Sequence, residues 1–123
     1  MTAKEMQQVE NAKVESFYDT LCKELNEKDD NGYYAYPWFR SGVNYGKRLR
    51  SCSAYVLETE NYYVLKSYNT IICAIEKETD VMYDFLRMVY GFTSISAQHI
   101  AKFSHDYSSS PWGCKTRYTW RRT

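Results

Sequence analysis

The run Thr70-Ile71-Ile72-Cys73-Ala74-Ile75 decides the fold class, because it has the length and composition of a buried β-strand. The polar turn Lys77-Glu78-Thr79-Asp80 follows it, and Glu58-Thr59-Glu60-Asn61 precedes another β-forming run, Tyr62-Tyr63-Val64-Leu65. Short polar turns between neighbouring runs of this kind are typical of antiparallel hairpins. The sequence therefore predicts an antiparallel meander over about residues 52–90.

The last strand of the meander is predicted from the alternation of its side chains. Side chains alternate from Val81 to Leu86 with the period of a strand. Met88-Val89-Tyr90 is expected to extend that strand or to follow it as another one.

A long amphipathic helix is predicted before the sheet, over about residues 3–28. Val9, Phe17 and Leu21 recur at helical spacing, and no Pro or Gly interrupts the segment. The turn-forming residues Asp29-Asp30-Asn31-Gly32 end it.

A second, shorter helix is predicted after the sheet, over about residues 93–106. Thr93 or Ser94 can cap its first turn, and Ile95, Ile100 and Phe103 are expected to form its core face. The last segment, residues 107–123, is basic and aromatic, and its alternation over residues 115–121 predicts an edge strand.

These elements predict an α+β fold in one domain, residues 1–123, in which the long N-terminal helix and the short helix pack on a mainly antiparallel sheet of three to five strands. A chain of 123 residues with 44% hydrophobic and 25% charged residues has the ordinary composition of one globular domain. No cofactor is implied by any motif. The sequence leaves open whether the protein is a monomer or a homodimer.

The cellular compartment is predicted from the absence of targeting and membrane-spanning segments in the sequence. The first eight residues have no apolar signal-peptide core, and no apolar run is long enough to span a bilayer. Cys22, Cys52, Cys73 and Cys114 show no CxxC spacing and are expected to be reduced thiols. We therefore expect a soluble, cytoplasmic protein with no membrane partner.

Charge is segregated along the chain although the net charge is only +1. Residues 1–32 and 57–87 are acidic in sum, whereas residues 33–56 and 88–123 are basic. Both basic segments are rich in Tyr and Trp, and Arg beside such rings suits phosphates and bases as well as protein hot spots. The predicted contact residues in these two segments are Trp38, Arg40, Lys47, Arg48, Arg50, Trp112, Lys115, Arg117, Trp120, Arg121 and Arg122.

Catalysis is not predicted. His99 and His105 stand six residues apart on one helix and point to different faces, so they cannot form a metal-binding pair. A nucleophilic pair of Cys52 or Cys114 with His99 is conceivable, but no flanking signature accompanies it. No phosphate-binding glycine motif or metalloprotease motif occurs.

Two segments resemble a small domain of uncharacterised function that is common in phages and mobile elements of Gram-positive bacteria. They are residues 65–75, with Ser67-Tyr68-Asn69-Thr70, and residues 90–103, with His99-Ile100-Ala101-Lys102-Phe103. The shared pattern is a Ser-Tyr-x-Thr strand and a His-Ile-x-x-Phe helix, and it covers about a third of the chain. A structural account of the pattern is that Ser or Thr caps the helix, that Ile100 and Phe103 anchor it, and that His99 bonds the strand end.

The resemblance implies a biological setting. Small proteins of mobile elements without catalytic motifs are often inhibitors of host defence, among which anti-CRISPR proteins are the main class. The leading hypothesis is therefore a non-enzymatic inhibitor that binds a host CRISPR effector nuclease or its nucleic acid. The alternative hypotheses are a nucleic-acid-binding accessory or regulatory protein and, third, an enzyme that uses a Cys or His.

Overall fold

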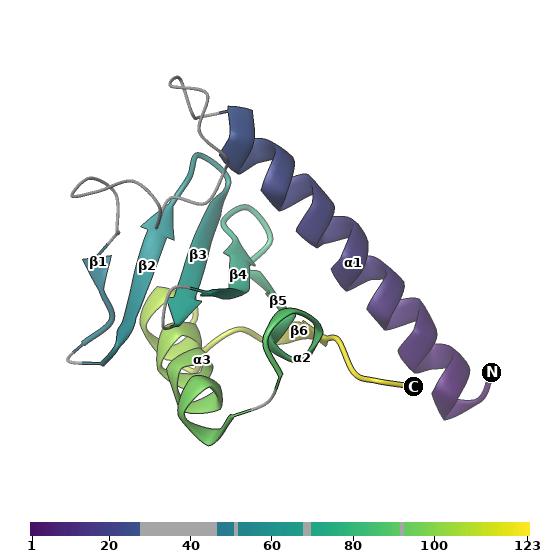
Figure 1. Ribbon diagram of the computed structural model, residues 1–123. Helices are drawn as coiled ribbons and strands as arrows, with labels where there is room; N and C mark the ends of the chain where they lie inside the picture. The colour runs from purple at the N-terminus through teal and green to yellow at the C-terminus, as the bar shows by residue number, and fades with distance from the viewer. Residues whose placement is uncertain (28–46, 51, 68–69, 92) are drawn as a thin grey trace.

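The computed structural model describes residues 1–27, 47–50, 52–67, 70–91 and 93–123 (Figure 1). The helices are α1 (Ala3–Glu27), α2 (Leu86–Val89) and α3 (Ser94–Tyr107). The strands are β1 (Lys47–Arg48), β2 (Ala54–Glu58), β3 (Tyr62–Ser67), β4 (Thr70–Glu76), β5 (Val81–Asp84) and β6 (Thr116–Thr119). The predicted α+β class with its long N-terminal helix is confirmed, and within the described residues the sheet has six strands, more than expected.

The strands lie in the order β1-β2-β3-β4-β5-β6, and all neighbours are antiparallel except β5 and β6. The predicted meander is therefore confirmed over its central strands. Because β6 runs parallel to β5, the chain must cross over between them, and α2 and α3 provide this connection. The predicted edge strand near the C-terminus is β6.

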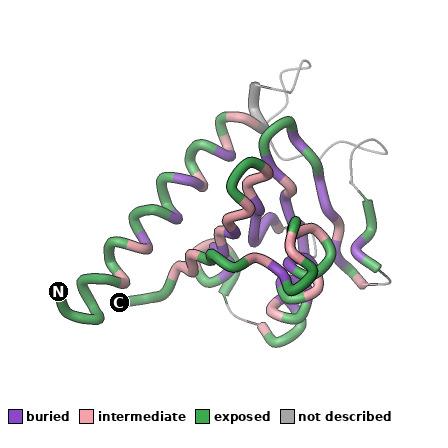
Figure 2. The backbone as a smooth tube through the Cα atoms, turned by 180° about the vertical axis from the view of Figure 1, so that it is seen from behind, coloured by how far each residue is buried: buried purple, intermediate pink, exposed green. Residues whose placement is uncertain are grey.

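The sheet is covered on both faces, and this explains the continuous apolar run of β4. Ile72, Cys73 and Ile75 belong to a core cluster with Ile100 and Phe103 of α3. Ile71 and Ala74 belong to a second cluster, to which α1 contributes Val14, Phe17 and Leu21. Strands buried on both faces lose the apolar–polar alternation of a half-exposed sheet. Figure 2 shows the buried stretches of the backbone gathered on the strands, with α1 exposed along its outer side.

Three sequence expectations are wrong in detail. Residues Met88 and Val89 belong to the helical turn α2 and not to a strand, because the chain turns after β5 to begin the crossover. Val9 and Ile95, expected on core faces, are 47% and 52% exposed. Val9 lies in the first half of α1 and Ile95 in the first turn of α3, and neither belongs to a core cluster.

The ends of the helices are built as their sequences indicate. Thr2 caps α1, since its Oγ1 accepts a hydrogen bond from the backbone N–H of Glu5. Thr93 caps α3, since its side chain accepts from the backbone N–H of Ser96 at 3.1 Å. None of the described helices is both long enough and apolar enough to cross a membrane.

Candidate anion-binding face

The side chains of α1 hold the C-terminal strand in place. The Asn11 amide donates to the backbone carbonyl of Arg121 at 2.6 Å and its Oδ1 accepts from the N–H of Arg121 at 2.9 Å. The N–H of Thr119 donates to the Glu10 carboxylate, and the Gln7 amide donates to the Thr119 carbonyl. These four bonds satisfy the backbone of Thr119 and Arg121 on the side away from β5. They cover part of an edge that would otherwise be free to pair with another strand.

The alternation of β6 divides its side chains between the two faces of the sheet. Tyr118 and Trp120 pack against the core cluster under α1, and the Trp120 indole N–H donates to the Glu15 carboxylate at 3.0 Å. Arg117, Thr119 and Arg121 therefore lie on the opposite face, toward α3. The structure thus places Trp120 apart from the arginines with which the sequence grouped it.

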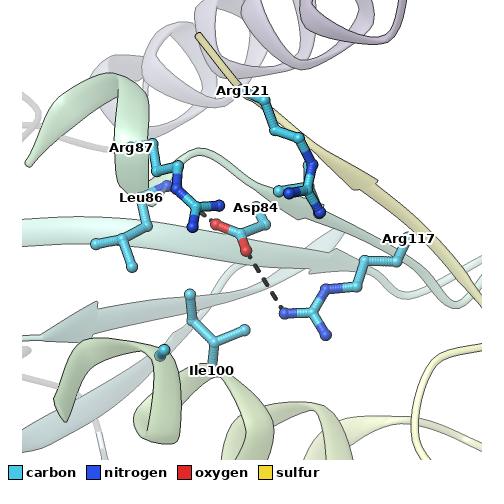
Figure 3. A pocket seen from close by; sticks show the side chains of 8 residues that line it. Asp84, Leu86, Arg87, Ile100, Arg117 and Arg121 are labelled. Carbon is cyan, nitrogen blue, oxygen red and sulfur yellow. Dashed lines mark hydrogen bonds and ion pairs between the residues drawn. The ribbon is translucent and has the colours of Figure 1, made fainter. Parts of the chain in front are cut away.

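A cleft of about 310 Å³ opens where β5, α2, α3 and the end of β6 meet. The side chains of Arg87, Arg117 and Arg121 extend into it and surround the carboxylate of Asp84 (Figure 3). The Arg117 Nη2 atom lies 3.5 Å from the Asp84 Oδ2 atom, so the two side chains form an ion pair. With three guanidinium groups and one carboxylate, the cleft carries an excess of positive charge.

Asp84 is fixed at the centre of this group. It is only 9% exposed, and its Oδ1 accepts from the backbone N–H of Leu86 at 3.0 Å. Its carboxylate can therefore hold the Arg117 guanidinium at the mouth of the cleft without itself moving into solvent. Apolar side chains of Leu86, Ala97 and Ile100 complete the lining.

Arg87 was not among the residues predicted for the site. It falls at the end of the acidic segment 57–87, so the summed charge of that segment conceals it. A local signal could not have added Arg87 to the site, because the cleft forms only where β6 returns beside β5.

The remaining C-terminal residues lie beside the cleft or beyond it. Lys115 is exposed just before β6, and Arg122 is exposed after it. Trp112 is 89% exposed, the most exposed of the large apolar side chains in the part of the chain that is described. It stands on a well-bonded loop, in which the Asp80 carboxylate accepts from the Ser108 hydroxyl and from the N–H of Ser109.

The first basic segment is placed at the other edge of the sheet. Lys47 and Arg48 form β1, and Arg48 donates from Nε to the carbonyl of Cys52 at 3.0 Å. Arg50 makes a bidentate pair with Asp106 of α3, at 2.8 and 2.6 Å, and this pairing lowers the pKa of the Asp106 carboxyl. Trp38 and Arg40 lie outside the described residues. The strands β1 and β6 therefore lie at opposite edges of the sheet, whereas α3, which belongs to the second basic segment, contacts the first segment through Asp106 and Lys102.

A buried polar cluster joins α3 to the end of β3. The Ser67 hydroxyl lies 2.8 Å from His99 Nδ1 and 3.2 Å from the Ser96 hydroxyl, and all three residues are buried. Burial lowers the pKa of His99, and the nearby Lys102 lowers it further. The expected bond from His99 to the strand end is confirmed, as are the anchoring roles of Ile100 and Phe103. These contacts give structural roles to Ser67, His99, Ile100 and Phe103, whereas Tyr68 and Asn69 lie outside the described residues.

Burial acts on several of the other reactive side chains. All four cysteines are free, and burial raises the pKa of the thiols of Cys22, Cys73 and Cys114. Burial also lowers the pKa of Lys66, whose Nζ lies 5.4 Å from the centroid of the Tyr55 ring. Within the described ranges, no three His, Cys, Asp or Glu side chains gather as metal ligands.

No family model matches the chain, and no curated protein or solved structure matches it either.

Proposed function

We propose that the protein is a non-enzymatic binding protein that engages an anionic partner through the face formed by Arg87, Arg117 and Arg121. The observation that supports this proposal is the convergence of three guanidinium groups on one cleft, with a single carboxylate among them. Guanidinium groups bind phosphate oxygens with paired, charge-assisted hydrogen bonds, which makes arginine the usual residue for this task. Nucleic acid is the partner class that best fits this chemistry.

An exposed tryptophan supports the nucleic-acid partner, although such a ring also suits a protein hot spot. The Trp112 ring is free to stack on a base, and stacking of this kind contributes about 1–3 kcal/mol for each base. Its loop is held by hydrogen bonds to Asp80 and Ser104, so the ring is presented without a large ordering cost.

The biological role proposed is inhibition of a host CRISPR effector nuclease by stoichiometric binding, in the cytoplasm of the bacterial host. This part rests on the resemblance to a domain of phages and mobile elements, whereas the cleft supports only the anionic partner. The basic face would then occupy the effector's guide or target strand, or the groove that holds it. The alternative role is an accessory or regulatory protein that binds nucleic acid directly.

The test is a titration of labelled single-stranded and double-stranded DNA and RNA, followed by fluorescence anisotropy at two salt concentrations. We expect micromolar or tighter binding to at least one of them, with an affinity that falls steeply as salt rises. Absence of binding at low salt would overturn naked nucleic acid as the partner. The inhibitor role is tested separately by effector cleavage assays, in which suppression near an equimolar ratio is expected. Full cleavage by every effector type at large protein excess would overturn it.

A further inference from the structure

The arginine cleft differs from an ordinary basic surface because its charges converge on a point. Arg87 comes from α2, whereas Arg117 and Arg121 come from β6 and the residues after it, and their side chains extend toward one carboxylate (Figure 3). A groove that follows a nucleic-acid backbone spreads its cations along a track. Here three cations and one anion share about 310 Å³, a volume at the lower end of small-ligand sites.

The charge of the cleft indicates what kind of anion fits it. Among the described residues that line the cleft, three guanidinium groups and the Asp84 carboxylate sum to a formal charge of +2. An internal phosphodiester carries a single negative charge, whereas a phosphate monoester carries roughly −1.5 to −2 at neutral pH. The monoester therefore matches the cleft, and a diester would leave part of its positive charge without a counterion.

The residues that line the cleft suit a phosphate at the end of a ligand. Thr119, Leu86, Ala97 and Ile100 close the cleft around the arginines, so that a ligand meets both polar and apolar surface. Asp84 is itself held by the Leu86 N–H, and it keeps the Arg117 guanidinium in place before any ligand arrives. A site ordered in advance loses less entropy on binding.

We propose that this cleft binds one phosphate monoester group, presented either by the phosphorylated end of a nucleic-acid strand or by a free phosphorylated small molecule. The proposal rests on the proposed function, since it assigns a ligand class to the same basic face. In it, Arg87, Arg117 and Arg121 donate to the phosphate oxygens, and Asp84 is a positioning residue for Arg117.

The experiment compares two single-stranded oligonucleotides of identical sequence, one with a 5′-phosphate and one with a 5′-hydroxyl, together with a 3′-phosphorylated form. Binding is followed by anisotropy, and ligand contacts are mapped by amide chemical shifts of the 14.6 kDa protein. We expect one phosphorylated end to bind about tenfold tighter than the hydroxyl form, as gained charge-assisted bonds require. Inorganic phosphate should compete with that end and shift the amides of residues 84–87 and 117–121, whereas chloride at equal ionic strength should not.

Matched variants show whether the effect belongs to the cleft. Arg87→Gln should abolish the preference for the phosphorylated end, and Arg122→Gln, which removes an equal charge from an exposed residue that does not line the cleft, should retain it. Thermal melts of both variants establish that they are folded. Asp84→Asn keeps the shape of the side chain but adds one net positive charge, so its positioning role is read from the phosphate-induced amide shifts of residues 117–121 and not from affinity.

The outcomes separate this proposal from the proposed function. Equal binding of phosphorylated and hydroxyl oligonucleotides would overturn the monoester site and leave the nucleic-acid face standing. Shifts caused by inorganic phosphate without binding of any oligonucleotide would support the site and identify a small phosphorylated molecule as its ligand. Absence of both responses would overturn the monoester site together with the nucleic-acid partner.

Discussion

The two edges of the sheet are both basic in sequence, but their arginines have different partners in the folded protein. At the β1 edge, Arg50 is paired with Asp106, and Arg48 donates to a backbone carbonyl of its own turn. At the β6 edge, three arginines converge on a cleft that holds one carboxylate. The helix α3 contributes to both, since Asp106 is near its end and Ala97 and Ile100 line the cleft. A basic segment therefore becomes a candidate site only where the fold provides more cations than carboxylates.

Charge reversal at each edge gives the largest expected difference. Arg117→Glu with Arg121→Glu replaces two cations of the cleft by anions, and we expect oligonucleotide affinity to fall more than about a hundredfold. Lys47→Glu with Arg48→Glu makes the same change in net charge at the β1 edge and should cost less than about fivefold. Anisotropy at one salt concentration measures both. Similar losses in the two variants would show that net charge alone decides binding.

The sequence predicted the central strands, the long N-terminal helix, the shorter second helix and the basic C-terminal segment because their signals are local. Alternation placed the strand at residues 115–121, and the apolar run of residues 70–75 predicted β4. The cleft depends on long-range packing, which one sequence does not display. Arg87 meets Arg121 only because β6 returns beside β5, and Arg50 is neutralised by a residue 56 positions away.

The second prediction concerns the hydrogen bonds that attach the end of β6 to α1 beside the cleft. Asn11→Ala removes two hydrogen bonds to the Arg121 backbone and should lower the free energy of unfolding by about 1–3 kcal/mol. Urea denaturation measures the change. Gln8→Ala on the exposed side of α1 is the control and should change stability by no more than about 0.5 kcal/mol. Equal effects of the two substitutions would mean that α1 does not hold β6 through Asn11.

The third prediction concerns the buried cluster of Ser67, Ser96 and His99, and it is that the folded protein loses stability in mild acid. The pKa of His99 in the folded protein lies below its ordinary value of 6.5, because burial and Lys102 disfavour the charged ring. The unfolded chain therefore binds the proton more readily. The contribution of His99 to stability is complete above pH 6.5 and is lost as the pH falls toward the folded pKa.

Chemical denaturation between pH 7.5 and 5 tests this pH dependence. His99→Gln should flatten the dependence over that range, whatever its effect on absolute stability. His105→Gln, at an exposed position of the same helix, should retain the dependence of the natural chain. If His105→Gln flattened the profile and His99→Gln did not, the assignment to the buried ring would be wrong.

The smallest expected effect comes from releasing Arg50 at the β1 edge. Asp106→Asn removes the ionised carboxylate that pairs with Arg50, a pairing that also lowers the pKa of this carboxyl. The released guanidinium should raise oligonucleotide affinity by no more than about fivefold, since exposed pairs contribute little. Glu78→Gln removes the same charge from the exposed β4–β5 turn and is the matched control. A gain of tenfold or more in Asp106→Asn alone would move the main binding surface to β1, because one freed arginine there would then outweigh the three that already converge beside β6.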